Sequence, residues 1–152
     1  MKQRLISYGP VTDLALNTWV KLARAYSTID KKSVENIRGF KLTQPQFSVI
    51  EALGHLGQMK VGELCNKMLV SGGNMTLVLD NLEKNKLIER IHSKEDRRAI
   101  IIKLTKNGKN LFDEIFSEHA KFITELICVL PAEEQKQLGN LLKKLGTGIQ
   151  QL

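Results

Sequence analysis

A stretch of six residues, Ser93 to Arg98, has no apolar side chain and carries three basic and two acidic residues. Guanidinium and ammonium groups are the side-chain groups that bind phosphates and carboxylates. An arginine on a narrow hairpin tip can also enter the minor groove of DNA, which excludes a helix and concentrates negative potential. This stretch therefore has the chemistry to bind an anionic partner.

The residues on either side of this stretch alternate in the way that β-strands require. In segments 87–92 and 99–104, every second residue would lie on the same face of an extended chain, which is the two-residue period of a β-strand. The sets that share a side are Leu87, Glu89 and Ile91 in the first segment, and Ile100, Ile102 and Leu104 in the second. We predict that the two segments form a hairpin whose exposed tip is the charged stretch.

A helix is expected directly before the hairpin, and Ser71 is suited to cap it because its hydroxyl can accept from a free amide. Gly72 and Gly73 each cost roughly 1 kcal/mol relative to alanine in a helix interior, so they suggest a close backbone approach, for example to a phosphate. The inner face, read from spacings of three and four, is Met75, Val78, Leu79 and Leu82. The outer face is Asn74, Thr76, Leu77, Asn81 and Lys84.

A shorter helix precedes this one, and its apolar positions are Val61, Leu64, Cys65 and Met68. About three residues then turn the chain into the next helix. Two helices joined in this way form a helix-turn-helix hairpin, in which the first helix braces the second. Helical hairpins are common, so the basic hairpin tip is the more informative feature.

The arrangement resembles the winged helix-turn-helix of the MarR family of transcriptional regulators. That family's wing is typified by an aspartate and basic residues, then a strand that ends in Leu-Thr, and a nearby glycine. The matching residues here are Asp96, Arg97 and Arg98, the strand 99–103, and Leu104, Thr105 and Gly108. The resemblance covers about Val11 to Leu152 and implies a mainly α fold with a small β-hairpin.

The resemblance also implies which residues meet DNA. Arg98 would be the wing arginine in the minor groove, Asp96 would orient it, and the helix from Gly72 would lie in the major groove. The helix residues expected to face the groove are Ser71, Gly73, Asn74, Thr76, Leu77 and Asn81. The wing residues expected to contact DNA are Lys94, Arg97 and Arg98.

Three positions depart from the family pattern. Basic residues often stand where this chain has Leu77 and Asn81, and a glycine usually stands in place of Lys86. Leu77 could touch a thymine methyl group, and Asn81 could bond an adenine edge or a phosphate, so no operator sequence can be carried over. Lys86 must either adopt a left-handed conformation or leave that role to Asn85.

Long helices at both ends are expected to pair two copies of the chain. The first, about Val11 to Asn36, would span about 39 Å, which is longer than a small domain needs. Its apolar seam is Ala15, Trp19, Leu22, Tyr26 and Ile29. Trp19 and Tyr26 could line a small-molecule pocket, but aromatic residues at helical spacing are more often packed in a core, so we expect a core and assign them no ligand.

The second set of pairing helices is expected within 106–152, beginning after the cap Thr105 and broken at Pro131. Its last seam is Leu138, Leu141, Leu142, Leu145, Ile149 and Leu152. The whole chain, 1–152, is thus predicted to be one domain. Its DNA-binding lobe would cover about 43–105, with the wing at 87–104.

The remaining helix is expected to begin at Thr43, which forms a capping-box pattern with Gln46. Phe47, Ile50 and Leu53 would face inward, and Gly54 and Gly57 would end the helix. His55 has no Asp, Glu or second His cluster nearby in the sequence and is left unassigned.

The composition agrees with an anionic partner but does not establish one. The net charge is +7, with +5 in residues 1–42, +5 in residues 60–109 and −2 in residues 110–152. Cys65 and Cys128 have no metal-ligand spacing and are expected to be buried, reduced thiols. The chain has no long apolar run, so we expect a cytoplasmic protein without a membrane span, metal or cofactor.

The expected function is sequence-specific binding of double-stranded DNA by a homodimeric transcriptional repressor. A two-fold dimer would place two helices in major grooves about 34 to 36 Å apart, on a pseudo-palindromic operator. Release by a small-molecule effector is left open. The alternative is a protein-protein interaction module in which Arg97 and Arg98 meet acidic side chains. An enzyme is disfavoured, because no nucleophile with a base, paired carboxylates or phosphate loop is found.

Overall fold

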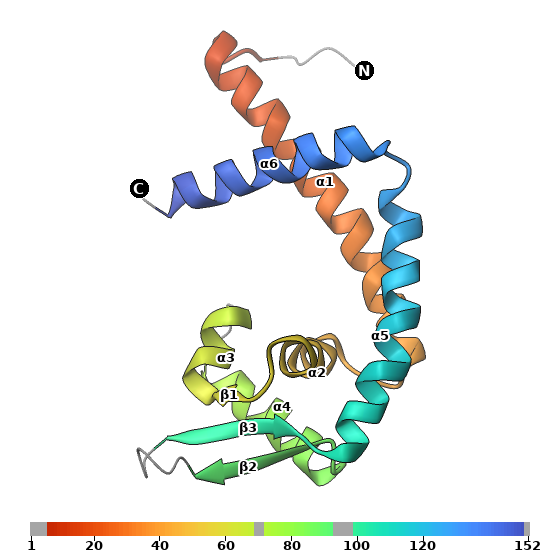
Figure 1. Ribbon diagram of the computed structural model, residues 1–152. Helices are drawn as coiled ribbons and strands as arrows, with labels where there is room; N and C mark the ends of the chain where they lie inside the picture. The colour runs from red at the N-terminus through yellow and green to blue at the C-terminus, as the bar shows by residue number, and fades with distance from the viewer. Residues whose placement is uncertain (1–5, 69–71, 93–98, 151–152) are drawn as a thin grey trace.

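The computed structural model describes residues 6–68, 72–92 and 99–150, which form six helices and three short strands (Figure 1). In chain order these are α1 (Pro10–Gly39), α2 (Gln44–Leu56), β1 (Met59–Lys60), α3 (Val61–Met68), α4 (Gly72–Lys84), β2 (Ile88–His92), β3 (Ile100–Leu104), α5 (Lys106–Ile127) and α6 (Ala132–Ile149). The predicted fold class, mainly α with a small β element, is confirmed.

A compact lobe is built from α2, α3, α4 and the sheet, and its apolar core lies between them. The predicted inner face of α4 is confirmed, since Met75, Leu79 and Leu82 are at most 1% exposed. They pack in one cluster with Ile88 of β2 and Ile102 of β3, so the helix and the hairpin share a core. Burial of each such side chain stabilises the lobe by about 1.5 to 3 kcal/mol.

The sheet is antiparallel with the order β1-β3-β2. The predicted hairpin is confirmed, with Ile88 opposite Leu104 and His92 opposite Ile100. The strand β1, which pairs Met59 with Ile102, was not predicted. Its two residues are too few to show an alternation, and only pairing with β3 makes them a strand.

The helix α4 ends in a left-handed residue, and that residue is Lys86, with φ of 57°. The amide of Leu87 donates to the carbonyl of Leu82 and the amide of Lys86 donates to that of Glu83, which is the bond pair of a Schellman motif. Asn85 does not take the left-handed position. The carbonyl oxygen of Lys86 accepts from Thr105 Oγ1 at 2.6 Å, which helps to hold this conformation.

The capping box at the start of α2 is confirmed, since the Thr43 hydroxyl and the Gln46 side chain each accept from the other residue's amide. Gly57 follows the last helical residue with φ of 79°. The prediction that Gly54 also ends this helix is wrong. Gly54 lies within α2, where a Cβ would overlap the Phe112 ring, so it allows α5 to approach.

The helix α5 runs from the sheet lobe to the far end of the molecule, where α6 turns away from it (Figure 1). Thr105 caps α5 as predicted, by accepting from the amide of Gly108 at 3.0 Å. His119, midway along α5, is buried with its ring 4.6 Å from that of Phe47. The helices α1 and α5 are joined there, because His119 Nδ1 lies 2.7 Å from Asn36 Oδ1.

The apolar seams of the end helices are largely uncovered in the single chain. Trp19 and Tyr26 are 64% and 66% exposed, so the single chain does not supply the core in which we expected them to be packed. Leu138, Leu141, Leu142, Leu145 and Ile149 of α6 are also exposed. Apolar patches of this kind, rimmed by polar residues, are typical of interaction sites.

The two cysteines differ in their surroundings. Cys65 is half-buried against the lobe core, as its place in the apolar pattern of α3 predicts. Cys128 is exposed, so the prediction of a buried thiol there is wrong. Cys128 is the C-cap residue of α5, and its amide donates to the carbonyl of Thr124.

Candidate nucleic-acid interface

The predicted DNA-facing residues of α4 lie on one exposed face of the helix. Asn74, Thr76 and Asn81 are exposed, and Leu77 is 66% exposed although it is apolar. Gly73 lies in the first turn of α4. Ser71 and the predicted wing residues Lys94, Asp96, Arg97 and Arg98 lie outside the described residues.

The base of the hairpin is attached firmly to the start of α5. The amide of Thr105 donates to the carbonyl of Leu87 at 3.0 Å. A Cβ on Gly108 would overlap that same carbonyl oxygen, so only glycine allows the helix to approach the strand so closely. The Leu-Thr and glycine pattern noted in the sequence thus fixes where the hairpin projects from the lobe.

The hairpin is also tied to α4, through a residue that sequence reasoning missed. Arg90 of β2 bonds Asp80 at 2.6 Å and Glu83 at 2.5 Å, and both acids belong to α4. Burial works against the charge of Arg90, but its hydrogen bond to Asp80 and the charge of Glu83 raise its pKa further above the usual value. The spacing of the two acids by three residues and the strand 87–92 could both be predicted from the sequence, but the packing of Arg90 against the acids of α4 could not.

A second pair lies within the hairpin itself. Lys103 of β3 is 3.0 Å from Glu89 of β2, and both side chains are well exposed. An exposed pair of this kind contributes at most about 1 kcal/mol to stability. It connects the two strands but does not reach α4.

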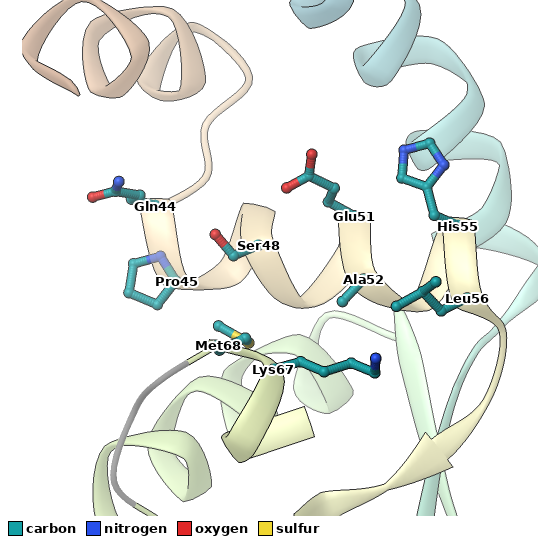
Figure 2. A pocket seen from close by; sticks show the side chains of 9 residues that line it. All are labelled: Gln44, Pro45, Ser48, Glu51, Ala52, His55, Leu56, Lys67 and Met68. Carbon is teal, nitrogen blue, oxygen red and sulfur yellow. The ribbon is translucent and has the colours of Figure 1, made fainter. Parts of the chain in front are cut away.

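An open hollow of about 690 Å³ lies between α2 and the end of α3 (Figure 2). It is lined by Gln44, Pro45, Ser48, Glu51, Ala52, His55, Leu56, Lys67 and Met68. The ring of His55 meets the edges or faces of Phe112 and Phe116, with centroids 5.0 and 4.3 Å away. The lining combines apolar side chains with a few polar and charged ones, as ligand pockets commonly do.

Other kinds of site find no support in the described part of the chain. Among residues 6–68, 72–92 and 99–150, no group of three His, Cys, Asp or Glu side chains could hold a metal ion. None of the helices over these residues is both long and apolar enough to cross a membrane.

A helix pair followed by a hairpin packed on the second helix defines the winged helix-turn-helix class of proteins. The MarR family model matches residues 42–100. The HTH-type transcriptional regulator MhqR of Bacillus subtilis is 33% identical over 93% of this chain and 97% of its own length. The chain belongs to the MarR family of transcriptional regulators.

Solved structures share this fold. A mutant of MarR from E. coli, complexed with operator DNA, matches with a TM-score of 0.78 and 23% identity over 90% of this chain and 99% of that one. NadR in complex with 4-hydroxyphenylacetate matches with a TM-score of 0.72 and 25% identity, over 84% of this chain and 93% of that one. MhqR is a transcriptional regulator, not an enzyme.

Proposed function

We propose that this protein binds double-stranded DNA sequence-specifically, as a homodimer on a pseudo-palindromic operator, and represses transcription in the cytoplasm by occupying promoter DNA. The observation that carries the proposal is the exposed face of α4, held against the base of the hairpin by a shared core and by Arg90. This arrangement suits a helix in the major groove beside a hairpin tip in the minor groove.

The surface of α4 supports specific readout. Asn74 and Asn81 can donate to and accept from base edges, and the exposed Leu77 can contact a thymine methyl group. The predicted wing residues Lys94, Arg97 and Arg98 would supply phosphate and minor-groove contacts, with Asp96 orienting Arg98. The E. coli relative with this fold was crystallised with operator DNA.

The uncovered seams support the dimer. Trp19 and Tyr26 on α1 and the leucines of α6 expose apolar surface that a second copy of the chain would bury. A two-fold axis through these helices would present two α4 helices to one face of a duplex, about one helical turn or 34 to 36 Å apart. The segments 11–36 and 106–152 are therefore proposed as the dimerisation helices.

The hollow between α2 and α3 supports release by a small molecule. A ligand seated there would contact both α2 and the end of α3, which leads directly into α4. Such a ligand lowers the DNA affinity only if it binds more tightly to a dimer whose α4 helices have another spacing. The loss of DNA affinity is then set by the difference between the ligand's affinities for the two dimer forms. The relative NadR was crystallised with 4-hydroxyphenylacetate, a small aromatic acid.

A salt series tests this proposal against a protein-protein module. The purified protein is titrated with a duplex carrying the region upstream of its own gene and with a scrambled duplex of equal length. A DNA reader loses affinity with a slope of about −0.9 for each phosphate neutralised, and it keeps its preference for one duplex. Equal and weak binding to both duplexes at low salt would instead favour acidic protein partners for Arg97 and Arg98.

A further inference from the structure

The guanidinium of Arg90 bonds two carboxylates, those of Asp80 and Glu83, on the helix that is proposed to enter the groove. The side chain of Arg90 is 25% exposed, while those of Asp80 and Glu83 are 54% and 40% exposed. The two carboxylates are thus more open to solvent than the guanidinium that bonds them. Its planar fork allows both acids to be bonded at once, which a single ammonium group could not do with the same geometry.

Asp80 lies beside two of the residues proposed to face DNA. It follows Thr76 by four residues and Leu77 by three, so these three side chains share one face of α4. All three are exposed. A carboxylate in that position would stand close to the phosphates of a bound duplex and would be repelled by them.

We propose that Arg90 is a positioning residue for DNA binding, because it neutralises Asp80 and Glu83 and holds both carboxylates toward the hairpin and away from the phosphates. This inference rests on the proposed function. Arg90 would act on DNA binding through the acids of α4, without contacting a base itself. The strand that carries Arg90 is packed on the core, because Arg90 stands opposite Ile102, a fully buried residue of β3.

Charge masking and simple structural support predict different effects on DNA affinity when the two acids are replaced. If Arg90 only braced α4, then removing the two carboxylates would break the brace and weaken DNA binding. If Arg90 masks the carboxylates, then Asp80→Asn with Glu83→Gln removes the repulsion and frees a cation near the duplex. The double variant should then bind DNA as tightly as the wild type or more tightly.

The experiment measures the affinity of four variants for the duplex that the wild type prefers, together with urea denaturation to establish that each is folded. Arg90→Ala should weaken binding by about tenfold or more, as loss of one partner of a close charge cluster does. Lys103→Ala is the matched control, because it removes one cation and one ion pair from the same hairpin without touching α4. It should stay within about threefold of the wild type.

The two remaining variants test the mechanism. D80N/E83Q should bind at least as tightly as the wild type, and D80N/E83Q/R90A should recover most of the affinity that Arg90→Ala loses. The loss in Arg90→Ala should also shrink as salt is raised, because exposed charges are screened beyond about 10 Å at 0.1 M salt. If Arg90→Ala does not fold, the comparison of D80N/E83Q with the wild type still decides between masking and bracing.

Several results would overturn the inference. Arg90→Ala that binds as well as Lys103→Ala would show that Arg90 has no special role. D80N/E83Q that binds more weakly than the wild type would show that the bonds brace α4 and do not mask charge. A wild-type protein that binds no duplex would reject the proposed function itself, whereas a binding wild type with an unaffected Arg90→Ala variant rejects only the role of Arg90.

Discussion

His119 of α5 and Asn36 of α1 are 83 positions apart in the chain, and His119 Nδ1 lies 2.7 Å from Asn36 Oδ1. The imidazole also lies on the ring of Phe47 of α2, so three helices converge on this residue. His119 therefore sits where the sheet lobe joins the end helices, and its charge state bears on how firmly they are joined.

Acid should weaken the fold through His119. Burial lowers the pKa of His119 below its usual value of 6.5, although the charge of Glu51 opposes the shift. Below about pH 6.5 the imidazole of His119 binds a proton in the unfolded chain but not in the folded chain. The free energy of unfolding therefore has its full value above that pH, and it decreases as the pH falls toward the pKa of His119 in the folded chain. Urea denaturation of the wild type and His119→Gln from pH 8 to 5, at one protein concentration, checks this.

The Gln variant should lose less free energy of unfolding than the wild type over that range, since it cannot titrate. His92→Gln is the matched control, because His92 is exposed at the end of β2. An identical pH dependence in the wild type and His119→Gln would show that the buried imidazole does not titrate in this window.

Gly54→Ala should destabilise the protein although it lies within a helix. Alanine is favoured over glycine by about 1 kcal/mol in a helix, but a Cβ at position 54 would overlap the Phe112 ring, and overpacking costs about 1 to 3 kcal/mol. The free energy of unfolding in urea measures the balance. Gly139→Ala in α6 is the control, since a Cβ there has open space, and it should stabilise the chain. Equal effects of the two substitutions would contradict the close contact with α5.

Lys86→Gly should stabilise the protein by about 1 kcal/mol, because a residue with a Cβ is strained in the left-handed region. Asn85→Gly is the neighbouring control and should give no such gain, since Asn85 does not occupy that region. Thermal unfolding of both variants checks the difference. A loss of stability in Lys86→Gly would mean that the lysine side chain contributes more than the strain costs.

The elements that could be predicted from the sequence are those whose own residues show a period. The inner face of α4 and the hairpin are examples, because a few neighbouring residues define each pattern. The capping box of Thr43 and Gln46 is equally local. What could not be predicted depends on contacts between different elements of the fold: the strand β1, the buried His119, and the bonds from Arg90 to Asp80 and Glu83.

Gly54 is a position where the local sequence pattern gave a wrong prediction. A glycine near the end of an apolar pattern usually indicates the helix end, yet here the approach of Phe112 from α5 requires it within the helix. The proposed DNA contacts at Ser71, Lys94, Asp96, Arg97 and Arg98 come from the family resemblance and stay predictions.

Leu142→Asp should split the proposed dimer. Leu142 lies on the exposed apolar seam of α6, and a carboxylate buried between two copies would be unpaired. Sedimentation of the variant should show monomers or unfolded protein. Asn140→Asp adds the same charge on another exposed side of α6 and should leave the dimer intact. A stable Leu142→Asp dimer would show that the dimer interface does not include this seam.

Selection of bound sequences from random double-stranded DNA tests the central claim most directly. A dimer that sets two α4 helices into successive major grooves should enrich a pseudo-palindrome whose half-site centres are about 10 to 10.5 base pairs apart. Arg98→Ala should retain the dimer and the half-site sequence but bind more weakly, because the minor-groove contact is lost. Recovery of no preferred sequence, or of a single half-site bound by one copy of the chain, would contradict the account.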